Sequence, residues 1–390
     1  MTTETKHDVF CVLPWNHLHI DTSGLVKSCC VSNTTYGNIN SNSVQEIWEG
    51  QEATQFRNKL LSNTPDKNCG NCYTREQSGK TSIRQESNVK YPDLVNAIKE
   101  GKAVPHQPTY VDIRFSNLCN LRCRTCWHGA SSSWYEEAKT LKRSAGETPL
   151  IKSINHFNSQ FVKLIPTLEE AYFAGGEPLL MVEHYTMLDA FIKTGNTSLR
   201  LRYNTNLSVL QHLKWDVLKL WSQFEHLEIG VSVDQIGIKA EYVRKDIKWE
   251  SFIDNFKQLK RALPKANIYI APTISIFNIH ELEDIHKYFV EQELITSDDI
   301  YFNILDRPNY FNVQVLPESI KERIAQQLSQ YADGLTEKTN AGFRECISYM
   351  MARDQSKLLP TLRKELQLLD ELRNERFEEV FPEMIENIRN

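Results

Sequence analysis

The chain has 390 residues, 41% of them hydrophobic and 24% charged, which is typical of a globular protein with two or three domains and a sizeable core. Its formal net charge of −5 argues against a general nucleic-acid-binding protein, since such proteins present a basic surface. No apolar run approaches the ~20 residues that span a bilayer, so we expect no membrane segment.

The nine cysteines are unevenly distributed along the chain. Residues 1–8 lack the apolar stretch of a signal peptide, so we expect a cytoplasmic protein. In that reducing compartment cysteines are more plausibly metal ligands than disulfide partners. Five of them fall within the first 72 residues, three lie together near the middle, and Cys346 stands alone.

A short, turn-rich segment opens the chain. Residues 17–20 alternate in polarity like a strand, and residues 22–24 have the chemistry of a tight turn. The resulting hairpin would bring Cys11 and Cys29 to the same end.

Two predicted helices follow the hairpin. Ser43 and Glu46 predict a capping box at the start of a helix near residues 43–48, and a second helix continues over 55–61. Cys69 and Cys72 come next, and their C-x2-C spacing suits a metal site.

Residues 73–108 form a predicted linker. It holds one predicted helix over 93–100, and Gly101, Pro105 and Pro108 close it before the next strand. We therefore place a domain boundary near residue 108.

From residue 110 onward, strand-like and helical patterns alternate. The strand-like runs are 110–115, 168–173, 198–203, 226–233, 267–276 and 299–305. Longer helical patterns separate them, as at 181–194 and 249–263. Alternation of this kind implies a parallel sheet with right-handed crossovers. Six units predict an α/β fold built as a partial (β/α)6, TIM-like barrel rather than a closed barrel of eight units.

The last segment, from about residue 317, is helical and charged. Leucines recur at helical spacing over 361–372, which is typical of a helix that packs against the barrel. Cys346 lies in an apolar stretch, where cysteine is usually a small buried hydrophobic side chain. The alternative role for Cys346 is that of a hydrogen-atom donor to a substrate radical.

Unusual residues gather where the predicted strands end. In a parallel barrel the active site lies at the C-terminal ends of the strands. Polar or glycine-rich motifs occupy or adjoin such ends at 119–126, 175–178, 204–206, 232–234 and 272–275. Their common edge indicates an active site.

The first of these motifs has the spacing Cys119-x3-Cys123-x2-Cys126. Thiolates so close together can face one small inorganic core, and iron–sulfur clusters are held by cysteines at such spacings. Zinc could use three thiolates and a histidine, and His128 lies two residues beyond the loop. The loop alone leaves both possibilities open.

The C-x3-C-x2-C spacing resembles the signature of the radical S-adenosylmethionine (radical SAM) superfamily. There three cysteines hold an iron–sulfur cluster whose fourth iron stays open, so that the amino and carboxylate groups of SAM can chelate it. The resemblance implies a SAM-binding [4Fe-4S] cluster on Cys119, Cys123 and Cys126. Members usually have an aromatic residue just before the third cysteine, whereas here Thr125 holds that place and Trp127 follows the cysteine.

Residues 174–178 resemble the GGEP motif of the same superfamily. Two glycines let the backbone come close to a ligand, and Glu177 can accept charge-assisted hydrogen bonds from the ammonium group of SAM. A simple strand-to-helix turn would favour the same residue types. The cofactor-binding positions that the resemblance implies are Gly175, Gly176, Glu177, Pro178, Asn206, Ser232, Asp234 and Arg244.

The N-terminal cysteines resemble a second kind of domain, the auxiliary-cluster domain called SPASM or, in its shorter form, twitch. Cys11-x12-Gly24-x4-Cys29 fits the opening C-x(9–15)-G-x4-C of that signature. The longer cysteine pattern of a full SPASM domain is absent, since Cys119 is the next cysteine after Cys72.

The resemblance therefore implies one auxiliary [4Fe-4S] cluster, in a domain placed N-terminally where the family usually has it C-terminally. Its implied ligands are Cys11, Cys29, Cys69 and Cys72. A zinc ion on the same thiolates is the alternative, and Cys30 could replace Cys29 as a ligand.

Both resemblances imply an enzyme that reductively cleaves SAM to a 5′-deoxyadenosyl radical, which then removes a hydrogen from a substrate. The expected substrate is a peptide or protein side chain, with a precursor peptide as partner; the alternative is a small sugar, alcohol or nucleotide. A one-electron reductant such as flavodoxin or ferredoxin is also implied. A zinc-binding module without catalysis is the alternative from another functional class.

The expected organisation has four parts. They are an auxiliary-cluster domain at 1–80, a linker with a helix at 81–108, the partial barrel at 109–316 and a helical extension at 317–390.

Overall fold

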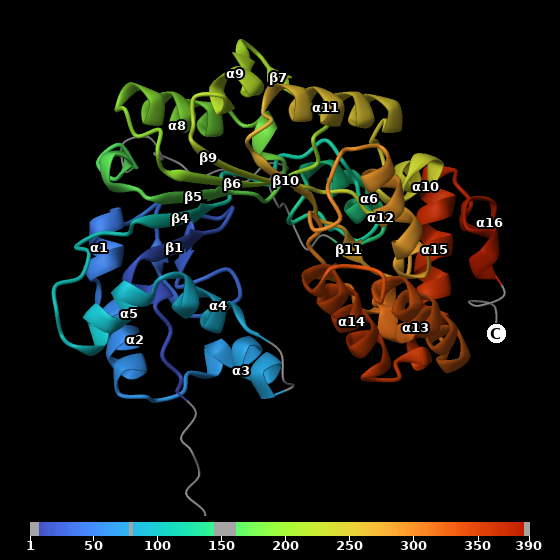
Figure 1. Cartoon of the computed structure of the whole chain (residues 1–390), viewed down its shortest axis with the longest axis horizontal. Coiled ribbons are helices and arrows are strands. Elements are labelled where there is room, and N and C mark those ends of the chain that lie inside the picture. The colour runs from blue at the N-terminus through green and yellow to red at the C-terminus, as the bar shows by residue number, and fades with distance from the viewer. Residues whose placement is uncertain (1–7, 78–80, 144–160, 386–390) are drawn as a thin grey trace, which may run out of the picture. The chain divides into compact units, whose positions relative to one another are not determined.

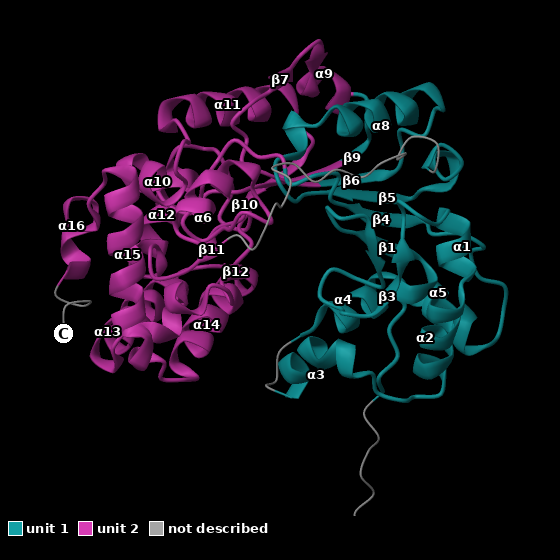
Figure 2. Ribbon diagram, turned by 180° about the vertical axis from the view of Figure 1, so that it is seen from behind, with its two compact units in different colours: residues 1–117, 151–202, 223–226 teal, residues 118–150, 203–222, 227–390 magenta. Residues whose placement is uncertain are grey.

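The computed structural model describes residues 8–77, 81–143 and 161–385. The chain forms two compact units, coloured separately in Figure 2. Unit 1 comprises Met1–Asn117, Ile151–Arg202 and Gln223–His226, and unit 2 comprises Leu118–Leu150, Tyr203–Ser222 and Leu227–Asn390. The expectation drawn from the first eight residues rests almost entirely on positions outside the described part of the chain.

Across the three described ranges, no helix is both long and apolar enough to cross a membrane. The described residues include all nine cysteines, and no disulfide joins any two of them.

The predicted α/β fold with a largely parallel sheet is confirmed. Within the described ranges the main sheet has eight strands in the order β10-β9-β6-β5-β4-β1-β2-β3. Five of the six predicted runs correspond to one strand each, and the run 267–276 is divided into two, the second of which pairs with the last strand in a separate two-stranded sheet. The strands are β4 (Tyr110–Ile113), β5 (Glu170–Phe173), β6 (Arg200–Thr205), β9 (His226–Val231), β10 (Asn267–Ile270), β11 (Thr273–Ile274) and β12 (Asn303–Ile304). β4 pairs in parallel with β5, β9 with β10, and β11 with β12.

The N-terminal hairpin is part of this sheet. β1 (His17–Ile20) and β2 (Leu25–Lys27) are antiparallel, as the turn at Gly24 predicts, and β3 (Thr35–Asn38) extends the pair. β1 is buried along its whole length and pairs in parallel with β4, Ile20 opposite Ile113. Because β1 and β4 share a hydrogen-bonded ladder, the cysteine-bearing segment is anchored to the strand that precedes the central cysteine loop. The four-part division of the chain stays a prediction.

The first helix of unit 1 begins as the sequence indicates, and the second begins four residues before the predicted run 55–61, at Gln51. Ser43 and Glu46 form the predicted capping box of α1. The segment 81–108 holds two helices, α4 and α5, where the sequence indicated one; α4 starts at a second capping box, formed by Ser82 and Gln85. The helices are α1 (Val44–Glu49), α2 (Gln51–Leu61), α3 (Gly70–Gln77), α4 (Ile83–Lys90), α5 (Pro92–Lys99) and α8 (Val182–Lys193).

The apolar face of β4 and β5 packs under α8 (Figure 1). Phe115 and Phe173 stack with ring centroids 5.7 Å apart, and Phe173 meets His184 of α8 edge to face at 5.2 Å. The alternate residues of the same strands carry polar side chains, which matters for the site described below.

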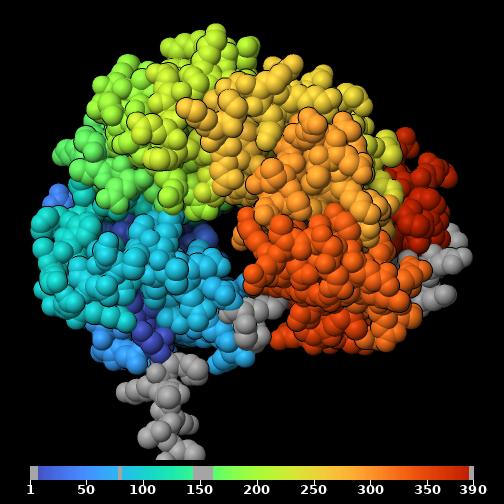
Figure 3. All heavy atoms as spheres, viewed as in Figure 1, coloured from blue at the N-terminus to red at the C-terminus, as the bar shows by residue number. Residues whose placement is uncertain are grey.

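Unit 2 is mostly helical. Its helices are α6 (Tyr135–Thr140), α9 (Val217–Trp221), α10 (Gly237–Val243), α11 (Trp249–Ala262), α12 (Leu282–Glu291), α13 (Glu318–Ala332), α14 (Glu337–Met351), α15 (Leu359–Arg373) and α16 (Phe377–Val380). A small hairpin, β7 (Gln211–His212) and β8 (Trp215–Asp216), precedes α9. α13 and α14 lie side by side, with the rings of Tyr331 and Phe343 at 5.4 Å, and their atoms form a continuous orange surface in Figure 3.

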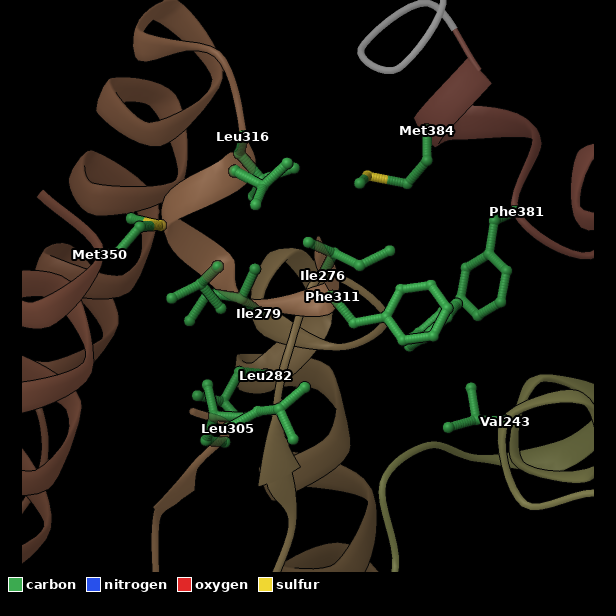
Figure 4. Packing of buried hydrophobic residues seen from close by; sticks show 14 of the residues in the cluster. Val243, Ile276, Ile279, Leu282, Leu305, Phe311, Leu316, Met350, Phe381 and Met384 are labelled. Atoms are coloured by element: carbon green, nitrogen blue, oxygen red, sulfur yellow. The ribbon is translucent and has the colours of Figure 1, made fainter. Parts of the chain in front are cut away.

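The C-terminal helices of unit 2 pack against its strands β11 and β12 through a large cluster of buried apolar residues (Figure 4). Ile276, Phe311, Met350 and Phe381 converge there from distant parts of the sequence. Cys346 belongs to the same cluster and is 1% exposed, the environment of a small hydrophobic side chain. The leucine-rich helix over 361–372 is confirmed as α15, and it packs into this core.

Candidate functional site

The central cysteine loop begins six residues after β4 ends, and backbone hydrogen bonds join it to the end of α10. The backbone N–H of Arg122 donates to the carbonyl of Lys245 at 3.0 Å, and that of Arg124 donates to the carbonyl of Val243 at 2.8 Å. This two-bond ladder brackets Cys123 on one side and Arg244 on the other. Two residues that are far apart in the sequence are thereby held next to each other.

Nitrogen donors lie near the sulfur atoms of Cys119 and Cys123. Leu121 N lies 3.5 Å from Cys119 Sγ, and Asn206 Nδ2 lies 4.0 Å from the same sulfur. Arg244 Nη1 lies 4.0 Å from Cys123 Sγ. Such N–H···S contacts suit thiolate ligands, because outer-shell donors orient the ligands and stabilise their negative charge.

The thiols of Cys123 and Cys126 are poor acids without a metal. Burial raises the pKa of Cys123 well above its usual range, the Arg244 guanidinium opposes this, and Cys126 and Cys119 raise it further. Burial also raises the pKa of Cys126. A cationic metal core would remove the mutual repulsion, so the residues present fit an iron–sulfur cluster.

Single-ion zinc coordination fits the two cysteine sets poorly. Zinc–sulfur bonds of about 2.3 Å in a tetrahedron require the ligand atoms to lie roughly 3.8 Å apart. Among the residues that the structure describes, the only three metal-ligating groups within 4.8 Å of one another are His280, Glu281 and Glu383. Neither cysteine set is that compact, whereas a multi-iron cluster needs wider spacing.

The group of His280, Glu281 and Glu383 already has its own cation. Lys239 Nζ lies 2.5 Å from Glu281 Oε1 and 2.7 Å from Glu383 Oε1. The lysine ammonium therefore holds the place that a metal ion would take.

Asp234 and Arg244 form a buried ion pair beside the loop. Arg244 Nε lies 2.9 Å from Asp234 Oδ2, and Asp234 is fully buried. Burial lowers the pKa of Arg244, but Asp234 and then Cys123 outweigh it, so that the pKa is raised and the guanidinium stays charged. Thr273 N, at the start of β11, donates to Asp234 Oδ1 at 2.7 Å and so fixes the carboxylate.

Asn206 and Ser232 stand at the ends of β6 and β9. Asn206 Nδ2 donates to Asn120 Oδ1 at 3.1 Å and so reaches into the cysteine loop. Ser232 N donates to Thr205 O at 2.8 Å, and its side chain is half-buried. Of the predicted cofactor positions, unit 2 thus gathers Asn206, Asp234 and Arg244 around the loop, and the roles of all of them toward SAM stay predictions.

The GGEP motif lies in unit 1, after β5. Gly175 has φ +74°, and a Cβ there would meet Arg114 Cδ at 2.5 Å. Gly176 also has a positive φ, of 55°. Glu177 is 1% exposed, and its Oε1 accepts from Leu179 N at 3.0 Å, which caps the short helix η5 (Pro178–Leu180). The motif therefore forms a tight turn that makes room for an arginine.

The four N-terminal cysteines named as auxiliary ligands line one pocket of unit 1. They share it with mostly apolar neighbours; the cysteines are Cys11, Cys29, Cys69 and Cys72. Burial raises the pKa of Cys29 to about 12 and that of Cys69 to about 11, and in both the neighbouring thiols add to the shift. Cys30 is exposed and does not line this pocket. The geometry favours Cys29 over Cys30, and the ligand assignment stays a prediction.

A row of buried polar side chains on β1, β4 and β5 was missed by the sequence reasoning. His19 Nδ1 lies 3.0 Å from Asp112 Oδ2, Arg114 Nη2 lies 3.1 Å from Asp112 Oδ1, and the Arg114 guanidinium lies 4.8 Å from the centre of the Tyr172 ring. Buried parallel strands are usually apolar on both faces, so charged residues on one face mark it as special. The alternation of polar and apolar residues over 17–20 and 110–115 indicates a polar face on each strand. Only the register between β1 and β4, however, shows that His19 lies opposite Asp112.

Two protein-family models match the chain. One, described as an iron–sulfur cluster-binding domain (SPASM), matches residues 11–73, and the other, the radical SAM superfamily, matches residues 113–289. No curated protein matches the chain at a significant level.

Among solved structures, anSMEcpe with bound AdoMet is 14% identical, covering 63% of this chain and 62% of its own, with a TM-score of 0.40. SuiB of Streptococcus suis, bound to S-adenosylmethionine, is 11% identical over 81% of this chain and 67% of its own, with a TM-score of 0.38. SuiB has also been solved bound to the precursor peptide SuiA, and anSMEcpe with the Kp18Cys peptide. The match spans less than two thirds of the anSMEcpe chain.

The two family matches fall on the two cysteine-bearing segments. The superfamily match contains the loop with Cys119, Cys123 and Cys126, and the SPASM match contains all four cysteines that line the pocket of unit 1. SAM and iron–sulfur clusters are the cofactors that these two domains imply. The chain belongs to the radical SAM superfamily and carries a SPASM iron–sulfur cluster-binding domain at residues 11–73, before the radical SAM segment in the sequence.

Proposed function

We propose that the protein cleaves SAM reductively and uses the product to remove a hydrogen atom from a peptide or protein side chain. The observation that carries the proposal is the environment of the central loop. The sulfurs of Cys119 and Cys123 receive N–H contacts from Leu121, Asn206 and Arg244, and the three cysteines do not form a group within 4.8 Å of one another, as ligands of a single zinc ion would.

Cys119, Cys123 and Cys126 would hold a [4Fe-4S] cluster with one open iron, and Cys11, Cys29, Cys69 and Cys72 a second, fully ligated [4Fe-4S] cluster. When bound, the first cluster and SAM supply a 5′-deoxyadenosyl radical that takes a hydrogen atom from the substrate.

The chain's own residues orient and shield this chemistry. Arg244, held by Asp234, places a fixed positive charge beside Cys123 and stabilises the thiolate form of that ligand. Asn206 donates one amide hydrogen to the loop and accepts from Ser208 N at 2.9 Å, so its orientation is fixed before any ligand binds. Glu177, which is buried, supplies a carboxylate for the SAM ammonium.

The peptide substrate rests on the SPASM resemblance of the N-terminal segment. A one-electron reductant, a flavodoxin or ferredoxin, would deliver the electron. A precursor peptide that stimulates 5′-deoxyadenosine formation would support the peptide class; stimulation by a small sugar, alcohol or nucleotide instead would replace it.

The decisive experiment is anaerobic reconstitution followed by iron and zinc analysis and a 5′-deoxyadenosine assay with dithionite. Wild type should hold about eight irons and Cys126→Ala about four, because each cubane needs at least three thiolates. Cys346→Ala, which removes a core thiol that lines neither site, is the matched control and should keep both clusters. Zinc in place of iron, or SAM cleavage that survives in Cys126→Ala, would refute the proposal.

A further inference from the structure

Arg124 is an unusual residue in the central loop. It lies between Cys123 and Cys126, and its side chain is fully buried (0% exposed). An arginine side chain stays charged in proteins, so a buried guanidinium needs charged or polar partners. Those partners show what holds this part of the loop in place.

The partners come from the far end of the chain. Arg124 Nη2 lies 2.6 Å from Asp370 Oδ1, on α15, and 2.8 Å from Glu375 Oε2, just beyond that helix. The guanidinium also stacks on the Tyr242 ring at 3.6 Å, and its Nε donates to the Tyr242 carbonyl at 3.1 Å. The Tyr242 hydroxyl donates to the same Asp370 oxygen at 2.7 Å. Arg124, Tyr242 and Asp370 thus close a ring of contacts.

α15 reaches the other side of Cys123 as well. Arg373, also with a fully buried side chain, donates from Nη2 to the Arg122 carbonyl at 2.8 Å and pairs with Glu137 Oε2 at 2.7 Å. Glu137 Oε1 pairs in turn with Arg122 Nη1 at 2.7 Å. The residues that flank Cys123 on both sides are therefore fixed by α15, directly or through Glu137.

We propose that helix α15, together with the turn that follows it, is a positioning element for the SAM-binding cluster, acting through Asp370 and Glu375 on Arg124 and through Arg373 on Arg122. The inference rests on the proposed function, in which Cys123 and Cys126 are cluster ligands. Without the two carboxylates, the guanidinium of Arg124 loses its ion pairs and moves toward water. The backbone between Cys123 and Cys126 shifts with the side chain. The ladder to residues 243–245 then loosens, and Arg244 loses its position beside Cys123.

The test compares iron release from reconstituted holoprotein to a coloured ferrous chelator under anaerobic conditions. Two phases are expected, one per cluster, and Cys126→Ala identifies the phase that belongs to the loop. In the near-isosteric variant Asp370→Asn/Glu375→Gln, the loop phase should accelerate about 10–100-fold, the range by which loss of outer-shell support lowers metal affinity. The phase of the four-cysteine site should stay unchanged.

Asp333→Asn is the matched control, because it removes the carboxylate of an exposed arginine pair, with Arg344, in the same helical segment. It should leave both phases unchanged. The reduced loop cluster is also followed by electron paramagnetic resonance, where SAM should shift the signal of wild type and of Asp333→Asn, but shift that of the double variant less.

Each outcome decides between the alternatives. Equal loop phases in the double variant and wild type overturn the inference, and so does parallel acceleration of both phases, which a general loss of stability would cause. Should the double variant not fold, Glu375→Gln alone leaves Asp370 in place and should give an intermediate loop phase; an unchanged one overturns the inference. A wild type that holds no iron on the loop overturns the proposed function instead.

Discussion

Replacing Gly175 by alanine tests the turn that follows β5. Gly175 has φ +74°, and a new Cβ would come within 2.5 Å of Arg114 Cδ and 3.1 Å of both Arg114 Cβ and Cγ. These atoms are the stem of the arginine, not its flexible end, so the whole side chain has to move. Its ion pair with Asp112, at 3.1 Å, moves with it.

A second glycine of unit 1 separates the cost of backbone strain from the cost of overpacking against Arg114. Gly195 has nearly the same φ, +75°, but a Cβ there would meet no atom within 4 Å. A left-handed backbone costs an alanine roughly 1–2 kcal/mol, and this cost applies at both positions. Overpacking against Arg114 adds about 1–3 kcal/mol at Gly175 alone. We therefore expect losses of about 2–5 kcal/mol for Gly175→Ala and about 1–2 kcal/mol for Gly195→Ala.

Anaerobic denaturant unfolding of the two holoprotein variants, followed by circular dichroism, measures the difference in the free energy of unfolding. SAM affinity, measured on the same samples, should fall for Gly175→Ala only. If both variants lose the same stability, the close approach of Arg114 to Gly175 does not constrain this turn, and the reasoning fails.

Three further outcomes can be measured. Cys69→Ala/Cys72→Ala should spare 5′-deoxyadenosine release in the absence of substrate, since the loop stays intact; release as low as in a variant without the loop cluster would contradict the auxiliary role. Glu177→Ala should weaken SAM binding by about 1.5–3 kcal/mol by calorimetry, and Glu177→Gln by less; no change in either would show that the carboxylate does not bind SAM. Burial lowers the pKa of His184 to about 3. Between about pH 6.5 and pH 3 the His184 ring is therefore protonated in the unfolded chain but not in the folded one. The free energy of unfolding should fall by up to ~1.4 kcal/mol per pH unit over this range as the pH drops. His184→Gln should flatten this slope, and parallel pH profiles would refute the prediction.

Local sequence patterns located most of the strands and the first capped helix. The run 226–233 became β9 (His226–Val231), and Ser43 capped α1 as expected, because both depend on neighbours a few residues away. Ser82 and Gln85 carry the same capping-box signal, but the helix that they begin, α4, is not among the predicted helices.

Tertiary pairings lay beyond such patterns. The His19–Asp112 contact depends on the parallel register of β1 with β4, and no local feature fixes which strand becomes the neighbour of an N-terminal hairpin. Nor could the sequence show that Arg124 is buried, since an arginine flanked by polar residues is normally solvated. The sequence indicated the types and the spacing of the candidate ligands, and the structure added the side chains that contact the loop.

The contact between Arg124 and Asp370 also has a temporal consequence. The two residues are 246 positions apart, so a ribosome that adds about 5–20 residues per second makes the aspartate roughly 12–50 s after the arginine. During that interval the loop that carries Cys123 emerges without the helix that fixes it. The contacts that hold Arg124 therefore form only after Asp370 and Glu375 have been synthesised and α15 has packed.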